Sequence, residues 1–132
     1  MRREVERVYC QMLTRIVRAP KSLSQKGRLP IWIISPDYPV YKLEKKPLRD
    51  VAVNDGLHMS GVALIPPGSR LRQRLDHHLR DNKRLYLQPD SPLCRIHAEP
   101  ITETPEQVAD YSLKSVKRSR TSIDDILVLT GA

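Results

Sequence analysis

The sequence predicts an α+β domain in which helices cover a central antiparallel sheet. Apolar residues recur with helical spacing in three segments, and short apolar runs between turn-forming residues are typical of strands. These segments follow one another as helix, strand, strand, helix, strand, strand, helix and strand. With 132 residues, 39% of them hydrophobic, the chain can form one modest core, so we expect a single domain over 1–132.

The first predicted element is an N-terminal helix from Glu4 to Arg18, within residues 1–20. Its apolar residues form one stripe, and Ala19-Pro20 ends it. Residues 29–132 then form the rest of the predicted core. The run from Ile31 to Ile34, which includes Trp32, is the first strand, and the flanking prolines predict an abrupt stop.

A turn at Asn54-Asp55-Gly56 leads into the second strand, in "LHMSGVALIPP". Ser69 is the expected cap of the following helix, "SRLRQRLDHHLRDN". On that helix, His77 and His78 point about 100° apart, which predicts surface residues and no shared metal. "RLYLQP" and "CRIHAEPI" are the next two predicted strands.

The last helix begins at a capping box, with Thr104 as the cap, Pro105 at the first position and Gln107 completing the box. A final strand is predicted in "SIDDILVLTGA". There, Asp124 and Asp125 could hold a metal, but we expect them to cap or to pair with the preceding arginines.

Charge favours an anionic partner. The net charge is +8 and the isoelectric point is about 9.8, and nucleic acid is the commonest anionic partner of a small basic domain. Cys10 and Cys94 lie in apolar stretches and fit no metal pattern, so buried reduced thiols are expected. The sequence has no apolar run long enough for a membrane span, and its charged N-terminus lacks the apolar core of a signal peptide, so we expect a cytoplasmic protein.

Tyr111 stands out on the last helix. On a helical wheel it shares the polar face with Lys114 and Arg118, opposite the apolar residues. One interpretation is a surface tyrosine that covers lysine methylenes. The other is a nucleophile, with Lys114 one turn away to stabilise the phenolate or the charge on a transferring phosphoryl group. The run "KSVKRSR", with Lys117, Arg118 and Arg120, is expected to contact phosphates without reading sequence.

Two further groups could bind a metal. His58 and Ser60 point to one face of the second strand, and His97 and Glu99 share a face of a later one. If these strands are neighbours, His58, His97 and Glu99 could surround one divalent cation such as Mn²⁺, Mg²⁺ or Zn²⁺. A histidine after a turn is also often purely structural, and this interpretation of His58 stays open.

The order of "LHMSGVALIPP" and "YSLK" resembles the HUH endonuclease superfamily, the rolling-circle replication initiators and their relatives, over about Val53 to Arg120. The resemblance is to small plasmid or phage replication proteins of bacteria. It implies a ferredoxin-like, nuclease-type core of the HUH/Rep type within 29–132. It also implies metal-dependent nicking and joining of single-stranded DNA through a 5′-phosphotyrosine intermediate.

The resemblance makes Tyr111 the nucleophile, Lys114 its motif partner and His58 the first metal ligand, with Mn²⁺ or Mg²⁺ as cofactor. Ser60 departs from the pattern, because it stands where the second histidine is expected. Either His97 or Glu99 completes the metal site, or the site is degraded. The alternative function is therefore a catalytically impaired nucleic-acid-binding protein that keeps the fold and the basic face, and a third is a small structural protein whose charge serves solubility.

Overall fold

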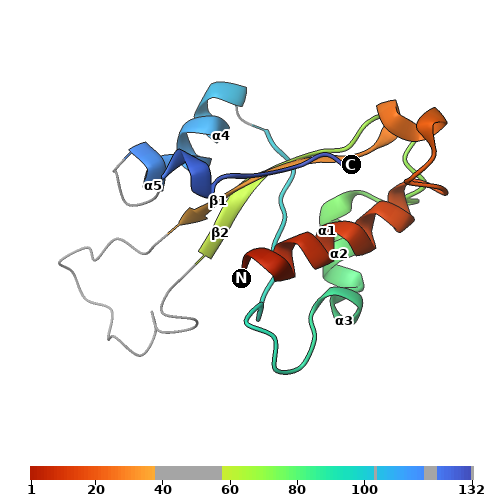
Figure 1. Ribbon diagram of the computed structural model, residues 1–132, viewed down its shortest axis with the longest axis horizontal. Helices are drawn as coiled ribbons and strands as arrows, with labels where there is room; N and C mark the ends of the chain where they lie inside the picture. The colour runs from red at the N-terminus through yellow and green to blue at the C-terminus, as the bar shows by residue number, and fades with distance from the viewer. Residues whose placement is uncertain (38–57, 103, 118–121, 132) are drawn as a thin grey trace. The chain divides into compact units, whose positions relative to one another are not determined.

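The chain combines a small antiparallel sheet with several helices in this computed structural model, which describes residues 1–37, 58–102, 104–117 and 122–131 (Figure 1). The strands β1 (Ile31–Asp37), β2 (His58–Leu64) and β3 (Leu127–Leu129) form a three-stranded sheet in the order β2-β1-β3. The α+β class and the antiparallel sheet are thereby confirmed. The predicted turn at 54–56 lies outside the described residues.

Two compact units divide the chain. The first consists of Met1–Trp32, Ala63–Thr102 and Leu129–Ala132, and the second of Ile33–Val62 and Glu103–Val128. We call them unit 1 and unit 2. Unit 1 holds α1 (Arg2–Ile16), η1 (Leu23–Arg28), α2 (Leu75–Asp81) and α3 (Lys83–Tyr86), whereas unit 2 holds α4 (Pro105–Ser112), α5 (Lys114–Lys117) and η4 (Ile123–Asp125).

The apolar stripe of α1 forms most of the core of unit 1. The predicted helix is confirmed, and its buried residues are Val5, Val8, Tyr9, Met12, Leu13 and Ile16. Each fully buried aliphatic side chain of this kind contributes about 1.5–3 kcal/mol. Helix α1 therefore owes its stability to this packed stripe more than to its local propensity.

Trp32 lies in this core at 7% exposure. Its ring meets that of Tyr9 edge-on, with 5.3 Å between centroids. The Tyr9 hydroxyl donates a 2.7 Å hydrogen bond to the carbonyl of Pro30, and burial raises the pKa of Tyr9 to about 12. The indole N–H of Trp32 is buried and has no hydrogen-bond acceptor among the described residues.

The predicted stop of the first strand at the prolines is wrong, because β1 continues through Pro36 to Asp37. A proline one residue before the end of a strand removes at most one ladder hydrogen bond, so the strand tolerates it. Strand β2 is confirmed. At Gly61 a Cβ atom would lie 2.0 Å from the carbonyl oxygen of Ile33, so only glycine fits this close approach of the two backbones.

Three predictions between 69 and 101 are corrected. Ser69 does not cap α2, which begins at Leu75; its Oγ instead accepts the N–H of Leu71 at 3.2 Å in a local turn. "RLYLQP" contains the helical turn α3 instead of a strand, because Tyr86 is held in the core at 1% exposure. "CRIHAEPI" is not a strand either, since it makes no pairing with the sheet.

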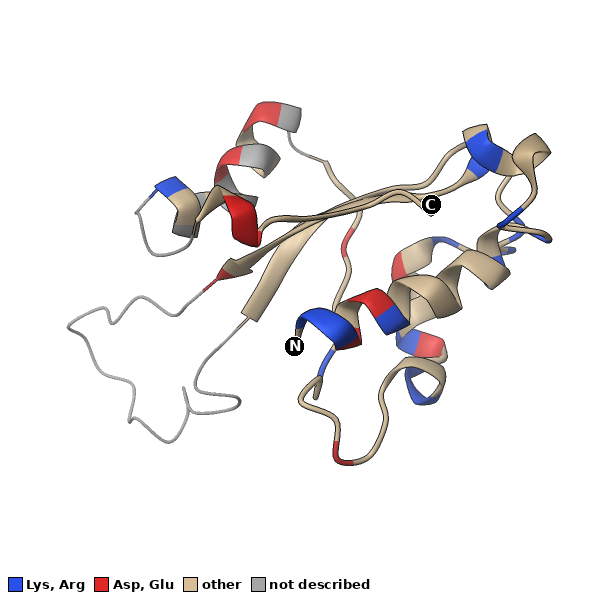
Figure 2. Cartoon of the chain, viewed as in Figure 1, with Lys and Arg blue, Asp and Glu red and all other residues tan. Residues whose placement is uncertain are grey.

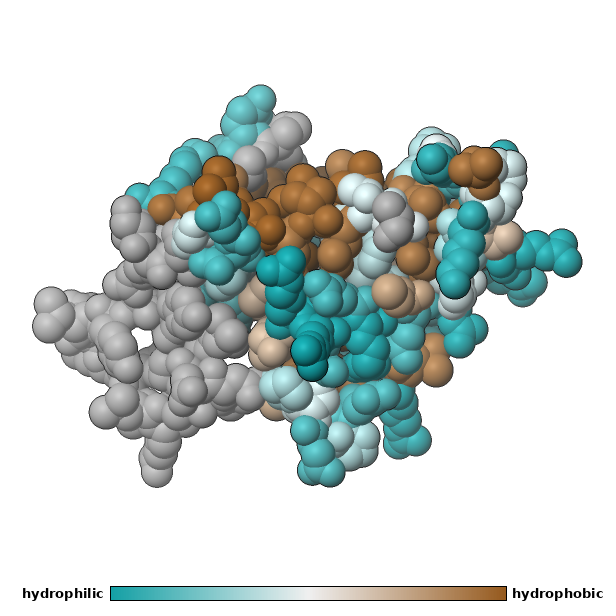
Figure 3. Space-filling model, in the orientation of Figure 1, coloured by the Kyte–Doolittle hydropathy of each residue, from teal (hydrophilic) through white to brown (hydrophobic). Residues whose placement is uncertain are grey.

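Burial was also misjudged for three side chains. His78 is buried at 8% exposure and not a surface residue, because its ring bonds to Tyr86 in the core. Cys10 and Cys94 are both exposed, and no disulfide joins them. Apolar residues also reach the surface among hydrophilic ones, as Figure 3 shows for one face, and the most exposed of them are Leu23 and Ile123.

Candidate functional site

The helix that carries Tyr111 begins as predicted. The Gln107 N–H donates to Thr104 Oγ1 at 3.5 Å, and the Thr104 N–H donates to Gln107 Oε1 at 3.3 Å, which completes the capping box. Tyr111 lies near the end of α4, and Lys114 begins α5 after a break at Leu113. The side chains of Tyr111 and Lys114 are outside the described part of the structure, so their pairing stays a prediction.

The predicted basic contacts of this region are only partly described. Lys117 is exposed and forms an ion pair with Asp110 in the same unit. An exposed pair of this kind contributes about 0–1 kcal/mol, so it leaves Lys117 able to change partners. Arg118 and Arg120 lie outside the described residues. Asp125 completes a capping box with Ser122 at η4, which confirms the capping role expected for this acidic pair.

His58 is exposed at the first residue of β2. Two residues on, the Ser60 hydroxyl donates a 3.5 Å hydrogen bond to Oδ2 of Asp37, at the end of β1. Sequence reasoning missed Asp37. Its signal was present, because a carboxylate that follows the apolar run Ile31–Ile34 after Ser35 and Pro36 stands where a strand is expected to end, and residues at such ends often form sites. A carboxylate is a better ligand for Mg²⁺ or Mn²⁺ than the hydroxyl of Ser60.

His97 and Glu99 do come together, although not on a strand. His97 Nε2 lies 2.8 Å from Glu99 Oε1, and both side chains are largely exposed. They line a hollow of about 280 Å³ in unit 1, together with the neighbouring pair of Asp76 and His77 and three cationic residues. The carboxylates of Asp76 and Glu99 offset most of the positive charge that these three residues bring to the hollow.

The resemblance implies a divalent metal, and the described side chains offer few donors to hold one. Within 1–37, 58–102, 104–117 and 122–131, no three His, Cys, Asp or Glu side chains are grouped so that they could hold a metal ion. Mg²⁺ takes about six oxygen ligands, and a pair of donors such as His97 and Glu99 does not supply them. The described donors thus do not fit a complete metal site, and the grouping of His58, His97 and Glu99 stays a prediction.

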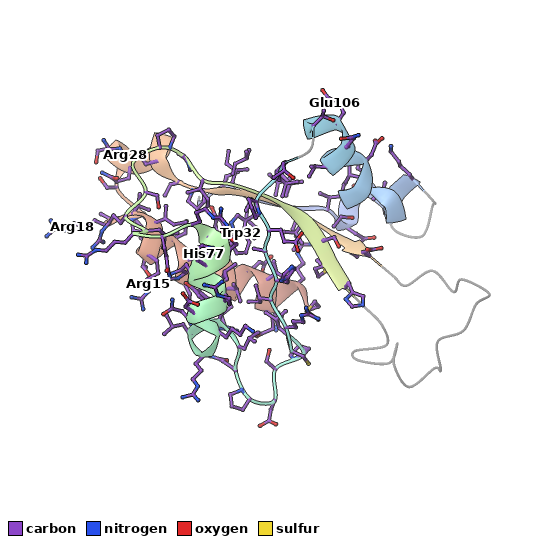
Figure 4. The ribbon with its side chains drawn as sticks, turned by 180° about the vertical axis from the view of Figure 1, so that it is seen from behind. Arg15, Arg18, Arg28, Trp32, His77 and Glu106 are labelled. Atoms are coloured by element: carbon purple, nitrogen blue, oxygen red, sulfur yellow. The ribbon has the colours of Figure 1, made fainter. Side chains whose placement is uncertain are left out.

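Positive charge gathers in unit 1 at the C-terminal end of α1. We call this the cationic surface; its residues are Arg15, Arg18, Lys21, Lys26, Arg28, Arg70 and Arg72. All seven are exposed, and residues 7–36 and 61–75 contain no Asp or Glu. Figure 2 shows Lys and Arg but no acidic residue on η1, and in Figure 4 Arg15, Arg18 and Arg28 point outward at one end of the unit.

This surface was missed as a site, although "KSLSQKGR" is visibly basic. The usable signal was the run of residues 7–36 without Asp or Glu, which holds several Lys and Arg. None of the helices within the described ranges is long and apolar enough to cross a membrane. Comparison with protein-family models, with curated proteins and with solved structures found no match for this chain.

Proposed function

We propose that this protein binds nucleic acid, and single-stranded DNA in particular, through the cationic surface. The observation that carries the proposal is the gathering of seven exposed Lys and Arg side chains, with no acidic residue in the segments that supply them. Such a surface attracts a phosphate backbone and gains affinity by releasing its counterions. Single-stranded DNA is the partner that the resemblance of "LHMSG" and "YSLK" implies.

The test is the salt dependence of binding to a labelled dT20 oligonucleotide, measured by fluorescence anisotropy. The logarithm of the association constant is expected to fall linearly with the logarithm of salt concentration, by about 0.7 per phosphate contact. Lys26→Gln with Arg28→Gln is expected to reduce this slope by about 1.4, the value for two lost contacts. Arg2→Gln with Arg3→Gln changes the charge equally at the other end of α1 and is expected to leave the slope unchanged.

Absence of binding at low salt would contradict the proposal. Equal effects of the two double variants would also contradict it, because net charge and not the cationic surface would then determine affinity.

A second proposal is that the protein nicks the strand it binds. The observation that favours it is that His58, the first residue of β2, and the helix that carries Tyr111 belong to the same compact unit. In this reaction the Tyr111 oxygen forms a bond to phosphorus and the bond from phosphorus to the 3′ oxygen breaks. The phenol proton passes through water to the leaving 3′ oxygen, which becomes a free 3′-hydroxyl. Lys114 would stabilise the negative charge on the phosphate. Mn²⁺ or Mg²⁺, with His58 as one ligand, would add positive charge there if donors outside the described residues complete the metal site.

The nicking proposal is tested by incubation with single-stranded oligonucleotides and Mn²⁺ or Mg²⁺, followed by denaturing electrophoresis. A covalent adduct is expected, lost in Tyr111→Phe and weakened in Lys114→Gln. Lys83→Gln is the control, since it removes the same charge at an exposed position outside the cationic surface and outside the predicted phosphate contacts. An adduct that persists in Tyr111→Phe excludes this nucleophile, and salt-sensitive binding without an adduct leaves a binding protein.

A further inference from the structure

A second hollow lies within the cationic surface, at the C-terminal end of α1. This open hollow has a volume of about 320 Å³ and is lined by Thr14 and Arg15, by residues 70–73 and by His78. All of these residues belong to unit 1 and are described. Its three arginines come from two separate segments, so the tertiary fold and not local sequence assembles them.

Backbone hydrogen bonds hold the walls of this hollow. The N–H of Arg70 donates to the carbonyl of Ile16 at 2.8 Å, which fixes the loop against the last turn of α1. Before it, Gly68 has φ +84, a left-handed conformation that glycine adopts without strain, and it turns the chain toward the helix. In another part of the wall, His78 Nε2 lies 2.7 Å from the hydroxyl of Tyr86, and this hydrogen bond fixes the orientation of the imidazole.

The charges in the hollow are not compensated by the described part of the chain. Arg7, Arg74 and Arg80 each form an ion pair with a carboxylate. By contrast, no ion pair joins Arg15, Arg70 or Arg72 to a carboxylate within the described ranges, and no acidic residue lines the hollow.

A purely structural role accounts for one of the three arginines. Arg15 lies in the last turn of α1, where a cation stabilises the negative end of the helix dipole. Arg70 and Arg72 lie outside any helix, so the dipole gives no reason for them. Three guanidinium groups around a concave surface repel one another, and an anion in the hollow would relieve that repulsion.

We propose that this hollow binds a phosphate group, namely one backbone phosphate of the nucleic acid that the cationic surface holds. This inference rests on the proposed function and adds the place where one phosphate is fixed. Guanidinium groups donate paired hydrogen bonds to phosphate oxygens, and the amide of Gln73 is a further neutral donor in the same lining. The hydroxyl of Thr14 instead donates to the carbonyl of Gln11 at 2.9 Å. The remaining cations of the surface then act as a less specific track for the strand.

The experiment uses the full chain, with inorganic phosphate and a dT20 oligonucleotide as separate probes. Inorganic phosphate is titrated while the imidazole signals of the 4 histidines are followed by NMR. The His78 signals are expected to move most, because this imidazole lines the hollow. Arg70→Gln with Arg72→Gln is expected to remove that shift and to weaken dT20 binding about tenfold, the usual effect of losing charge-assisted contacts to phosphate.

The charge-matched control is Arg2→Gln with Arg3→Gln, about 20 Å away at the start of the 15-residue helix α1. If both double variants weaken dT20 equally, or if phosphate moves no His78 signal, the hollow is not a phosphate site, although the protein still binds DNA. If the unaltered chain binds phosphate in the hollow but not dT20, the source is a free phosphate, and the proposed function fails instead.

Discussion

Substitution of Tyr86 by phenylalanine removes a single oxygen atom from the core of unit 1. Tyr86 is 1% exposed, and its hydroxyl lies 2.7 Å from His78 Nε2 and 3.7 Å from the sulfur of Met12. The ring of phenylalanine fills the same space, so packing is preserved and only the polar contact is lost. His78, at 8% exposure, then keeps a buried nitrogen without its partner.

The expected cost follows from these contacts. A neutral buried hydrogen bond contributes about 1 kcal/mol, and leaving its partner unsatisfied costs about 1–3 kcal/mol, so Tyr86→Phe should lower the free energy of unfolding by about 2 kcal/mol. At a urea dependence of about 2 kcal/mol per molar, the midpoint falls by about 1 M. His78→Leu should cost a similar amount, and the double variant should cost less than the sum of the two.

Urea unfolding followed by tryptophan fluorescence is the assay. Trp32 is the single tryptophan of the chain and is buried against Tyr9 in unit 1, so its emission reports the unit that contains the pair. A midpoint shift below about 0.2 M for Tyr86→Phe would refute the reasoning, since the hydrogen bond would then contribute too little to detect. Strict additivity of the two single variants would refute the coupling between the two side chains.

Three further predictions follow from other contacts. Gly61→Ala should destabilise the protein by about 1–3 kcal/mol, because its Cβ would meet the backbone of β1, whereas Gly27→Ala, with open space around it, should not; thermal unfolding compares the two. Burial, and then Arg15, lower the pKa of His78 below 6.5, so the unfolded chain binds this proton more readily than the folded one. Stability should therefore fall as pH drops from above 6.5 toward the folded pKa of His78, and a flat urea midpoint over that range would contradict it. Hydrogen bonds from Ser91, at 2.7 Å, and from Arg7 lower the pKa of Glu4; in Ser91→Ala that pKa should rise, as measured by carboxyl ¹³C NMR, and an unchanged value would exclude the contact.

Local patterns predicted the elements whose signals lie within a single segment of the sequence. The helix near Glu4 carries a complete apolar stripe, and the capping box at Thr104 and Gln107 is formed by residues three apart, so both follow from sequence alone. The strand that begins at His58 follows from alternation and a preceding turn signal. The strand predicted in "RLYLQP" is wrong, because a short apolar run is ambiguous between strand and helix. The buried position of Tyr86 favours the helical turn.

For the candidate sites, sequence determined the chemistry available and tertiary structure determined its grouping. The order of His58, Tyr111 and Lys114 and the net charge of +8 are properties of the chain itself, and they support a nucleic-acid partner before any fold is considered. Only the fold decided that Arg15 and Arg72, 57 positions apart, line one hollow, and that the largely buried His78 also lines it. The fold likewise decided that Ser60 meets Asp37. Such groupings depend on hydrogen bonds and packing between distant segments, which no spacing within a single segment can predict.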